Sequence, residues 1–182
     1  MKRKFFILFF IFLPSEASSS IKENIIQNLN NINNLTFNFE QNINGKIQNG
    51  NCTLEYPKKI FCKYELQNKK ILVSNGKSLV IKTSTSYYIY PIEKTTLNLI
   101  LNKKFLLKNI KKSRERLIDN KFINFSFIEN DYEINVFFDK DTYNLVGWQT
   151  LDMYQNLSIT YIFSIQRNKK ISKNLFKLPV QN

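Results

Sequence analysis

An unbroken apolar stretch, Phe5–Leu13, follows directly after three basic residues at positions 2–4. Its nine residues are too few to cross a bilayer as a helix, which takes roughly 20. Pro14 interrupts the stretch, and the Ser-Glu-Ala segment at 15–17 offers small residues of the kind that a signal peptidase reads. The pattern predicts a cleavable secretory signal peptide over residues 1–17; a short uncleaved anchor is the alternative.

Apolar residues then recur at the spacing of an amphipathic helix: Ile21, Ile25, Ile26, Leu29 and Ile32. Side chains three and four positions apart share one helix face, so the pattern predicts about three turns with one apolar stripe. The serines at 18–20 can cap its start, and the asparagine-rich residues that follow end it.

From Leu35 onward the apolar period changes from that of a helix to that of a strand. Turn-forming pairs such as Asn44-Gly45 and Asn75-Gly76 separate the runs, leaving no room for crossover helices. Neighbouring strands should therefore pair antiparallel. The predicted strands lie near 35–43, 47–56, 60–67, 70–75, 78–83 and 86–91, and after an interruption near 118–128, 131–138, 145–152 and 157–166.

The interruption begins after Pro91 with a short helical turn predicted over 97–101, capped by Thr95 or Thr96. Residues 102–116 then contain seven basic residues interleaved with apolar ones. We interpret 102–116 as a solvated, mobile connection; a cationic docking face for a partner or for lipid headgroups is the alternative.

These elements predict a mainly β fold in residues 18–182, as one domain: an unclosed antiparallel barrel, or half-barrel, covered by short helices. A strongly curved sheet with an apolar inner face needs a cover, and the helix from Ile21 and the 97–101 turn are the natural lid. An imperfect cover leaves an apolar cavity suited to acyl chains. An ordinary filled core is the alternative.

The formal net charge of +13 is typical of proteins that meet nucleic acid or an anionic membrane. The abundance of Lys, Asn, Ile and Phe is also what AT-rich coding produces. Because the chain has no basic–aromatic RNA motif and no zinc-ligand spacing, we expect no nucleic-acid partner.

Candidate catalytic chemistry is sparse. The chain has no histidine, which removes the commonest general base and metal ligand. The acidic pairs, such as Asp139 with Asp141, fall in predicted turns, and no glycine-rich phosphate loop is present. We therefore expect no enzyme activity, no cofactor and no metal.

Two cysteines, Cys52 and Cys62, flank a predicted turn and could face each other across a hairpin. In an oxidising compartment this placement favours a disulfide, although two buried thiols are the alternative.

Four segments carry a resemblance to a known family. Leu35–Gln41 looks like a first strand ending in Phe-x-Gln, and Tyr56-Pro57 with Tyr64 resembles a second hairpin. Ile71–Leu79 is similar to a Val-Ser-Asp-Gly-Lys-x-Leu segment, and Phe138–Trp148 looks like a late hairpin. In this order they resemble the periplasmic outer-membrane lipoprotein carriers, the LolA family.

The resemblance implies a monomeric periplasmic chaperone of a Gram-negative bacterium. Such a carrier takes acylated lipoproteins from an inner-membrane ABC transporter and hands them to an outer-membrane acceptor. Strand alternation then suggests which residues contact the acyl chains. The expected cavity residues are Phe37, Phe39, Leu54, Ile60, Leu72, Leu79 and Ile81, and the expected lid residues are Ile25, Ile26, Leu29, Leu97 and Leu101.

One position departs from the family. Where many members carry an arginine that latches the lid, this chain has Tyr56, which can hydrogen-bond to a lid carbonyl but carries no charge.

Three other functions share parts of this pattern. A periplasmic lipid sensor would keep the fold, a cationic surface-binding protein would use residues 102–116, and an outer-membrane acceptor would need a lipidated cysteine after the signal.

Overall fold

The computed structural model describes residues 20–65, 68–129, 132–151 and 155–181, so the predicted signal peptide lies outside the described residues. Within these ranges no helix combines the length and the apolar character needed to span a bilayer.

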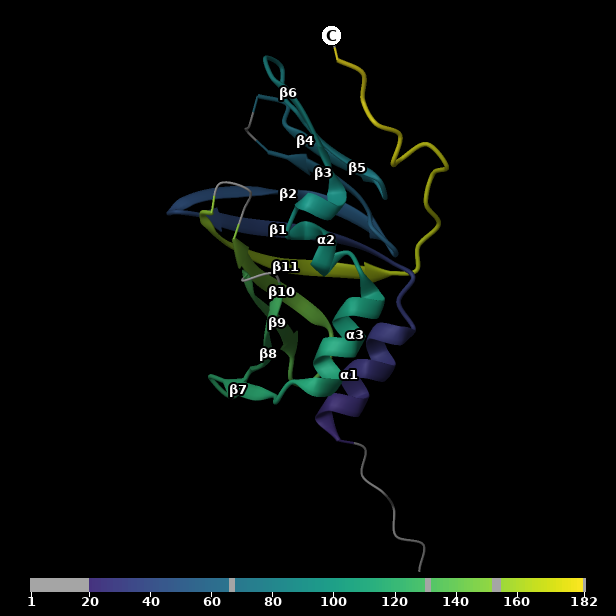
Figure 1. The fold of residues 1–182 in the computed structure, drawn as a ribbon. Coiled ribbons are helices and arrows are strands. Elements are labelled where there is room, and N and C mark those ends of the chain that lie inside the picture. Colours follow the sequence, from purple (N-terminus) through teal and green to yellow (C-terminus); the bar gives the residue numbers. More distant parts are fainter. Residues whose placement is uncertain (1–19, 66–67, 130–131, 152–154, 182) are drawn as a thin grey trace, which may run out of the picture.

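Eleven strands form one antiparallel sheet in the order β6-β5-β4-β3-β2-β1-β11-β10-β9-β8-β7 (Figure 1). Strands β1 and β11 pair at the centre, whereas β6 and β7 are the two edges and do not pair with each other. The sheet is therefore an unclosed half-barrel, which confirms the predicted fold class. The strands are β1 Asn34–Ile43, β2 Lys46–Glu55, β3 Lys59–Tyr64, β4 Ile71–Asn75, β5 Ser78–Lys82, β6 Tyr87–Pro91, β7 Arg116–Ile118, β8 Phe122–Glu129, β9 Tyr132–Asp139, β10 Leu145–Leu151 and β11 Leu157–Arg167.

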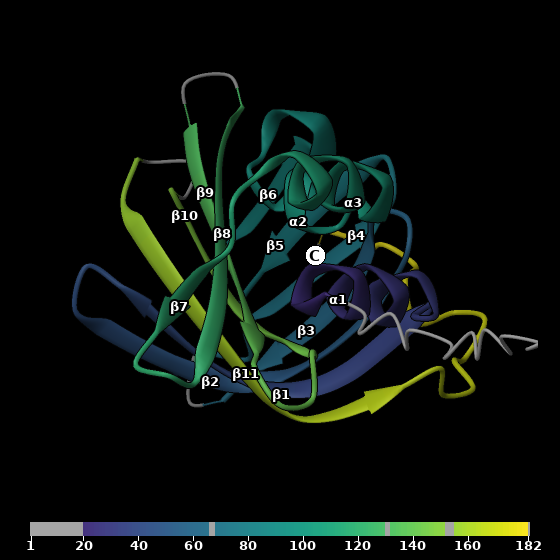
Figure 2. The same cartoon turned by 90° about the horizontal axis from the view of Figure 1, so that it is seen from below.

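Helices cover the concave side of the sheet, as Figure 2 shows. They are α1 Ile21–Asn30, the 3-10 helix η1 Ile92–Lys94, α2 Leu97–Ile100 and α3 Lys103–Lys112. Helix α1 begins at a capping box: the Ser20 hydroxyl accepts a hydrogen bond from the Glu23 amide, and the Glu23 carboxylate accepts one from the Ser20 amide. Such reciprocal bonds satisfy amides that the first helical turn leaves free.

Strand alternation places the core on the concave face. In β1 the odd-numbered residues Leu35, Phe37 and Phe39 are buried, and α1 contributes Ile25 and Leu29 to the same hydrophobic core. The two periodicities of the sequence thus meet in one core, since each element buries one face.

The prediction of a mobile connection at 102–116 is wrong over most of its length. Residues 103–112 form helix α3, whose start is capped by the Asn102 side chain accepting from the Phe105 amide. Leu106 and Ile110, four positions apart, are fully buried, and the Phe105 ring meets the Phe127 ring edge-on with centroids 5.6 Å apart. Burial of this narrow apolar stripe stabilises a helix whose other face is densely basic.

The predicted strand at 118–128 is in fact two strands, β7 and β8, joined by a turn at 119–121. Asp119 and Asn120 adopt positive φ there, a conformation that asparagine and aspartate tolerate better than most residues.

Gly50 is a position where the sheet tolerates no side chain. A Cβ atom there would lie 2.2 Å from the Lys63 carbonyl oxygen and 2.8 Å from the Phe39 ring. We expect Gly50→Ala to lower the free energy of unfolding by about 1–3 kcal/mol through overpacking. Urea denaturation measures the change. Asn51→Ala, at the next and exposed position, is the control and should stay within about 0.5 kcal/mol of wild type; equal losses in both variants would refute the steric argument.

Candidate functional site

Two adjoining cavities lie on the concave face against residues 95–97 at the start of α2. The larger has a volume of about 240 Å³ and the smaller about 60 Å³. Both are contacted by Leu97 from the helix and by Trp148 from β10, and they share Gln41, Tyr64 and Leu72 as well. The cavity is therefore bounded by strands from both wings of the half-barrel and by one short helix.

The strand register builds an apolar wall for the cavity. One row of cross-strand neighbours runs over five strands, each residue paired with the next: Phe37, Cys52, Cys62, Leu72 and Ile81. The Phe37 ring meets Trp148 edge-on at 6.3 Å between centroids, and Phe39 meets Tyr64 at 5.0 Å. Such edge-on pairs hold large rings in defined positions along the wall.

Six of the seven expected cavity residues lie at the cavity. Phe37, Phe39, Ile60 and Leu72 line the smaller part, and Leu72, Leu79 and Ile81 line the larger. Leu54 lines neither, because it is fully buried within the core.

Of the expected lid residues, only Leu97 lines the cavity. Ile25, Leu29 and Leu101 are buried in the core, and Ile26 packs against it. Helix α1 therefore packs on the core beside α3, whereas Leu97 of α2 lies directly at the cavity.

Sequence reasoning missed the polar lining residues of the larger cavity: Gln41, Lys70, Thr95, Thr96, Thr150 and Ser158. Strand alternation predicts the place of Gln41, because Gln41 lies two positions after Phe39 and therefore on the same face of the strand as Phe37 and Phe39. Strand alternation identifies inward-facing positions whatever their polarity, so polar side chains at such positions line a cavity as apolar ones do.

Gln41 organises the polar part of the cavity wall. Its amide nitrogen donates to the Ser158 hydroxyl at 3.0 Å and to the Thr160 hydroxyl at 3.2 Å, and its amide oxygen accepts from the Tyr64 hydroxyl at 3.3 Å. Burial raises the pKa of the Tyr64 phenol, so that this hydroxyl stays protonated and donates.

Tyr56, at the expected latch position, does not latch the lid. Its hydroxyl is buried with no hydrogen-bond partner in the part of the chain that the structure describes, so the expected bond to a lid carbonyl is absent. Burial raises the pKa of the phenol. The ring instead packs against the core and lies 5.7 Å from the Lys103 ammonium.

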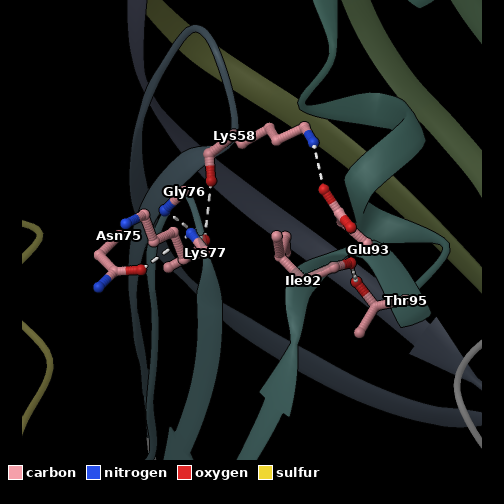
Figure 3. Close-up of polar contacts among 8 residues, drawn as sticks. Lys58, Asn75, Gly76, Lys77, Ile92, Glu93 and Thr95 are labelled. Carbon is pink, nitrogen blue, oxygen red and sulfur yellow. Dashed lines mark hydrogen bonds and ion pairs between the residues drawn. The ribbon is translucent and has the colours of Figure 1, made fainter.

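The neighbouring Lys58 makes the contact to the lid. Its ammonium pairs with Glu93 of η1 at 3.2 Å (Figure 3). Its backbone amide donates to the Leu101 carbonyl at 2.9 Å. The Lys58 carbonyl accepts from the Ser74 hydroxyl at 2.7 Å, which ties the β2–β3 turn to β4. The other end of the lid is held by the Thr96 hydroxyl, which donates to the Leu151 carbonyl at 2.6 Å.

Figure 3 also shows how the β4–β5 turn and η1 are held locally. The Asn75 side chain accepts from the Lys77 amide at 3.0 Å, and the Thr95 hydroxyl donates to the Ile92 carbonyl at 2.7 Å. The Ile92 amide donates to the Lys77 carbonyl at 2.9 Å, so that the start of the helical insert is anchored to this turn.

Lys103 joins α3 to the end of α1. Its ammonium donates to the carbonyls of Asn30 and Ile32 at 3.1 and 2.8 Å. Carbonyls at a helix C-terminus carry partial negative charge and lack intrahelical donors, so a lysine is well matched to them.

Cys52 and Cys62 form a disulfide across the β2–β3 hairpin, with Cα atoms 4.1 Å apart. They are directly opposed in the register, and both line the smaller cavity. The bond therefore joins two strands of the cavity wall.

The cavity wall is mainly apolar, with a smaller polar part. The polar part is hydrogen-bonded, and the described residues contain no cluster of three or more His, Cys, Asp or Glu side chains suited to a metal ion. In its shape and apolar lining, this cavity has the features that sites for apolar ligands share.

The comparisons identify the family of this half-barrel. The chain matches the outer membrane lipoprotein carrier protein LolA over residues 30–179, and it belongs to that family. The resemblance seen in the four sequence segments is thereby confirmed. No curated protein matches the chain.

Three solved structures illustrate the likeness, which at such low identity concerns the fold alone. An uncharacterized conserved protein from Thermus thermophilus is 7% identical with a TM-score of 0.52, covering 89% of this chain and 93% of that one. A LolA superfamily protein from Nitrosomonas europaea is 6% identical with a TM-score of 0.45, covering 88% and 99%. MucB of Pseudomonas aeruginosa, in its complex with MucA, is 10% identical with a TM-score of 0.48, covering 87% and 60%.

The Lys103 contacts predict a measurable change in the dynamics of α1 and α3. Lys103→Met removes two charge-assisted hydrogen bonds, and bonds of this kind contribute about 1.5–3 kcal/mol to stability. Because 1.4 kcal/mol corresponds to about a factor of ten, we expect amide exchange at the end of α1 and in α3 to accelerate tenfold or more. Hydrogen–deuterium exchange with peptide resolution measures this. Lys104→Met removes the same charge from the adjacent exposed position and should leave exchange unchanged; acceleration by both variants would assign the effect to charge alone.

The disulfide predicts a loss of stability on its removal. Because the bridge closes a short hairpin loop, the free energy of unfolding of the Cys52→Ala/Cys62→Ala double variant should be about 2–3 kcal/mol lower than that of the oxidised protein. Chemical denaturation without reductant measures the difference. Wild type unfolded in the presence of reductant is the matched comparison, and an unchanged midpoint there would contradict the prediction.

Proposed function

We propose that this protein is a periplasmic lipoprotein carrier. It binds the acyl chains of lipoproteins in the cavity beneath α2, receives them from an inner-membrane ABC transporter and delivers them to an outer-membrane acceptor. The observation that carries the proposal is the cavity itself, whose wall joins Leu72, Ile81 and Trp148 under Leu97 of the lid. Membership of the lipoprotein carrier family supports it.

The driving force is burial of the acyl chain. Each methylene removed from water contributes about 0.8 kcal/mol, so a long chain supplies ample free energy without covalent chemistry. Binding has to be reversible for delivery, and the cost of opening the lid reduces the net affinity.

The size of the cavity requires that the lid move. A volume of about 240 Å³ lies below the roughly 300–1,000 Å³ typical of sites for drug-sized ligands. Helix α2 has only four residues, and the hydrogen bonds Thr96–Leu151 and Lys58–Leu101 hold its two ends. At about 0.5–1.5 kcal/mol each, such bonds can be exchanged for acyl contacts.

A cavity-filling variant tests the proposal. Leu72→Trp places a large ring on the inner face and, by excluding about two methylenes, should lower the affinity for a synthetic triacylated lipopeptide about tenfold. Titration of the purified protein with a fluorescently labelled lipopeptide measures the affinity. Ile47→Trp, on the outer face of β2 at a 57% exposed position, is the matched control and should bind as wild type does.

Transfer distinguishes the carrier from a lipid sensor with the same fold. Purified protein incubated with inner membranes should co-elute with a released triacylated lipoprotein and pass it to outer-membrane vesicles. Failure to co-elute with any lipoprotein would overturn the carrier function. Lipopeptide binding without transfer would instead identify a sensor.

A further inference from the structure

Lys70 stands at the edge of the cavity, immediately before β4. Its side chain lines the larger cavity together with Leu72 and Ile81. The ammonium donates to the Gln48 amide oxygen at 2.8 Å and lies 3.9 Å from the centre of the Tyr64 ring. The cation is thus held in place beside an apolar surface by two neutral groups.

In the part of the chain that the structure describes, no carboxylate forms an ion pair with this cation. Among the described residues, the ion pairs join Lys22 to Glu115, Lys58 to Glu93 and Lys59 to Glu55, and Lys70 takes part in none of them. Partial burial of the ammonium lowers the pKa of Lys70 below its ordinary value. A half-buried cation that contacts an amide oxygen and a ring face, and that forms no ion pair among the described residues, is suited to bind an anion.

A polar row continues from Lys70 across the concave face. The register pairs Gln48 with Gln41 and Gln41 with Thr160, and at the next level along the strands it pairs Ser158 with Thr150. Strands β2, β1, β11 and β10 thus contribute hydrogen-bonding side chains at two adjacent levels of the sheet. Thr150, Ser158 and Thr160 are buried. Hydroxyl and amide groups arranged in this way can bind the oxygens of a headgroup.

The apolar row of Leu72, Ile81 and Phe37 lies two levels along the strands from this polar row, with Phe39 and Tyr64 at the level between them. Leu72 borders both parts of the cavity. One amphiphile can therefore satisfy both rows, with its chain against Leu72 and Trp148 and its head at Lys70.

We propose that Lys70 and the polar row form a headgroup site, and that the cavity binds free acyl lipids with an acidic head, either a carboxylate or a phosphate. The proposal rests on the proposed acyl-binding function and extends it to a second class of ligand, since a triacylated lipoprotein N-terminus offers the cavity acyl chains without an acidic head of this kind.

Displacement of a neutral pyrene-labelled alkane from the purified protein tests the proposal. Palmitate should displace the probe about tenfold better than hexadecanol, which has the same chain length and no charge, because only palmitate gains a charge-assisted bond. Comparison of palmitate with lysophosphatidylglycerol then shows whether the site prefers a carboxylate or a phosphate.

Variants assign the preference to Lys70. In the Lys70→Met variant, palmitate and hexadecanol should displace the probe equally well. In the Lys70→Arg variant, palmitate should still displace it better than hexadecanol. Lys63→Met is the control, since it removes the same charge from the exposed outer position of neighbouring β3. Thermal melting confirms that each variant is folded, and the wild-type comparison of acid with alcohol does not depend on any variant.

The outcomes separate this proposal from the one on which it rests. Equal displacement by palmitate and hexadecanol in wild type, or an acid preference that survives in Lys70→Met, would overturn the headgroup site while leaving acyl binding intact. A protein that binds neither the pyrene probe nor the lipopeptide would overturn the acyl-binding function itself.

Discussion

The structure depends on one constraint: the apolar concave face of a strongly curved sheet has to be covered although the sheet does not close. The edge strands β6 and β7 are consecutive among the strands, and the connection between them contains η1, α2 and α3. The segment that could have joined the two edges is thus used as the cover. Because α1 comes from before the central strand β1, the concave face is covered from two separate parts of the chain.

The cover is not uniform. Helices α1 and α3 are joined by the Lys103 contacts and bury Ile25, Leu106 and Ile110 completely, so they form a firm support. Helix α2 is a single turn held at its ends, and it is the part that lies on the cavity. Under the proposed carrier function, displacement of α2 alone would open the cavity while α1 and α3 stay in place.

Polar groups occupy one part of the cavity wall, and their position bears on the orientation that a bound amphiphile would take. A wholly apolar cavity would accept a chain in either orientation. In the proposed headgroup site, the hydrogen-bonded group of Gln41, Tyr64, Ser158 and Thr160, with Lys70 beside it, would receive the head, and the rest of the wall would receive the chain. The disulfide between Cys52 and Cys62 fixes two strands of the apolar part against each other.

Much of this was determined by the sequence alone. Alternation at Phe37 and Phe39, with turns at Asn44-Gly45 and Asn75-Gly76, specifies antiparallel strands and their inner face, because strand periodicity and turn geometry are local properties. Helix α3 was missed because its dense lysines concealed the narrow stripe of Leu106 and Ile110. Only the tertiary structure decided that Lys58 and not Tyr56 holds the lid, and that Lys70 joins the polar row. Those contacts link residues far apart in sequence, and their geometry follows from how the sheet curves and how the helices lie on it.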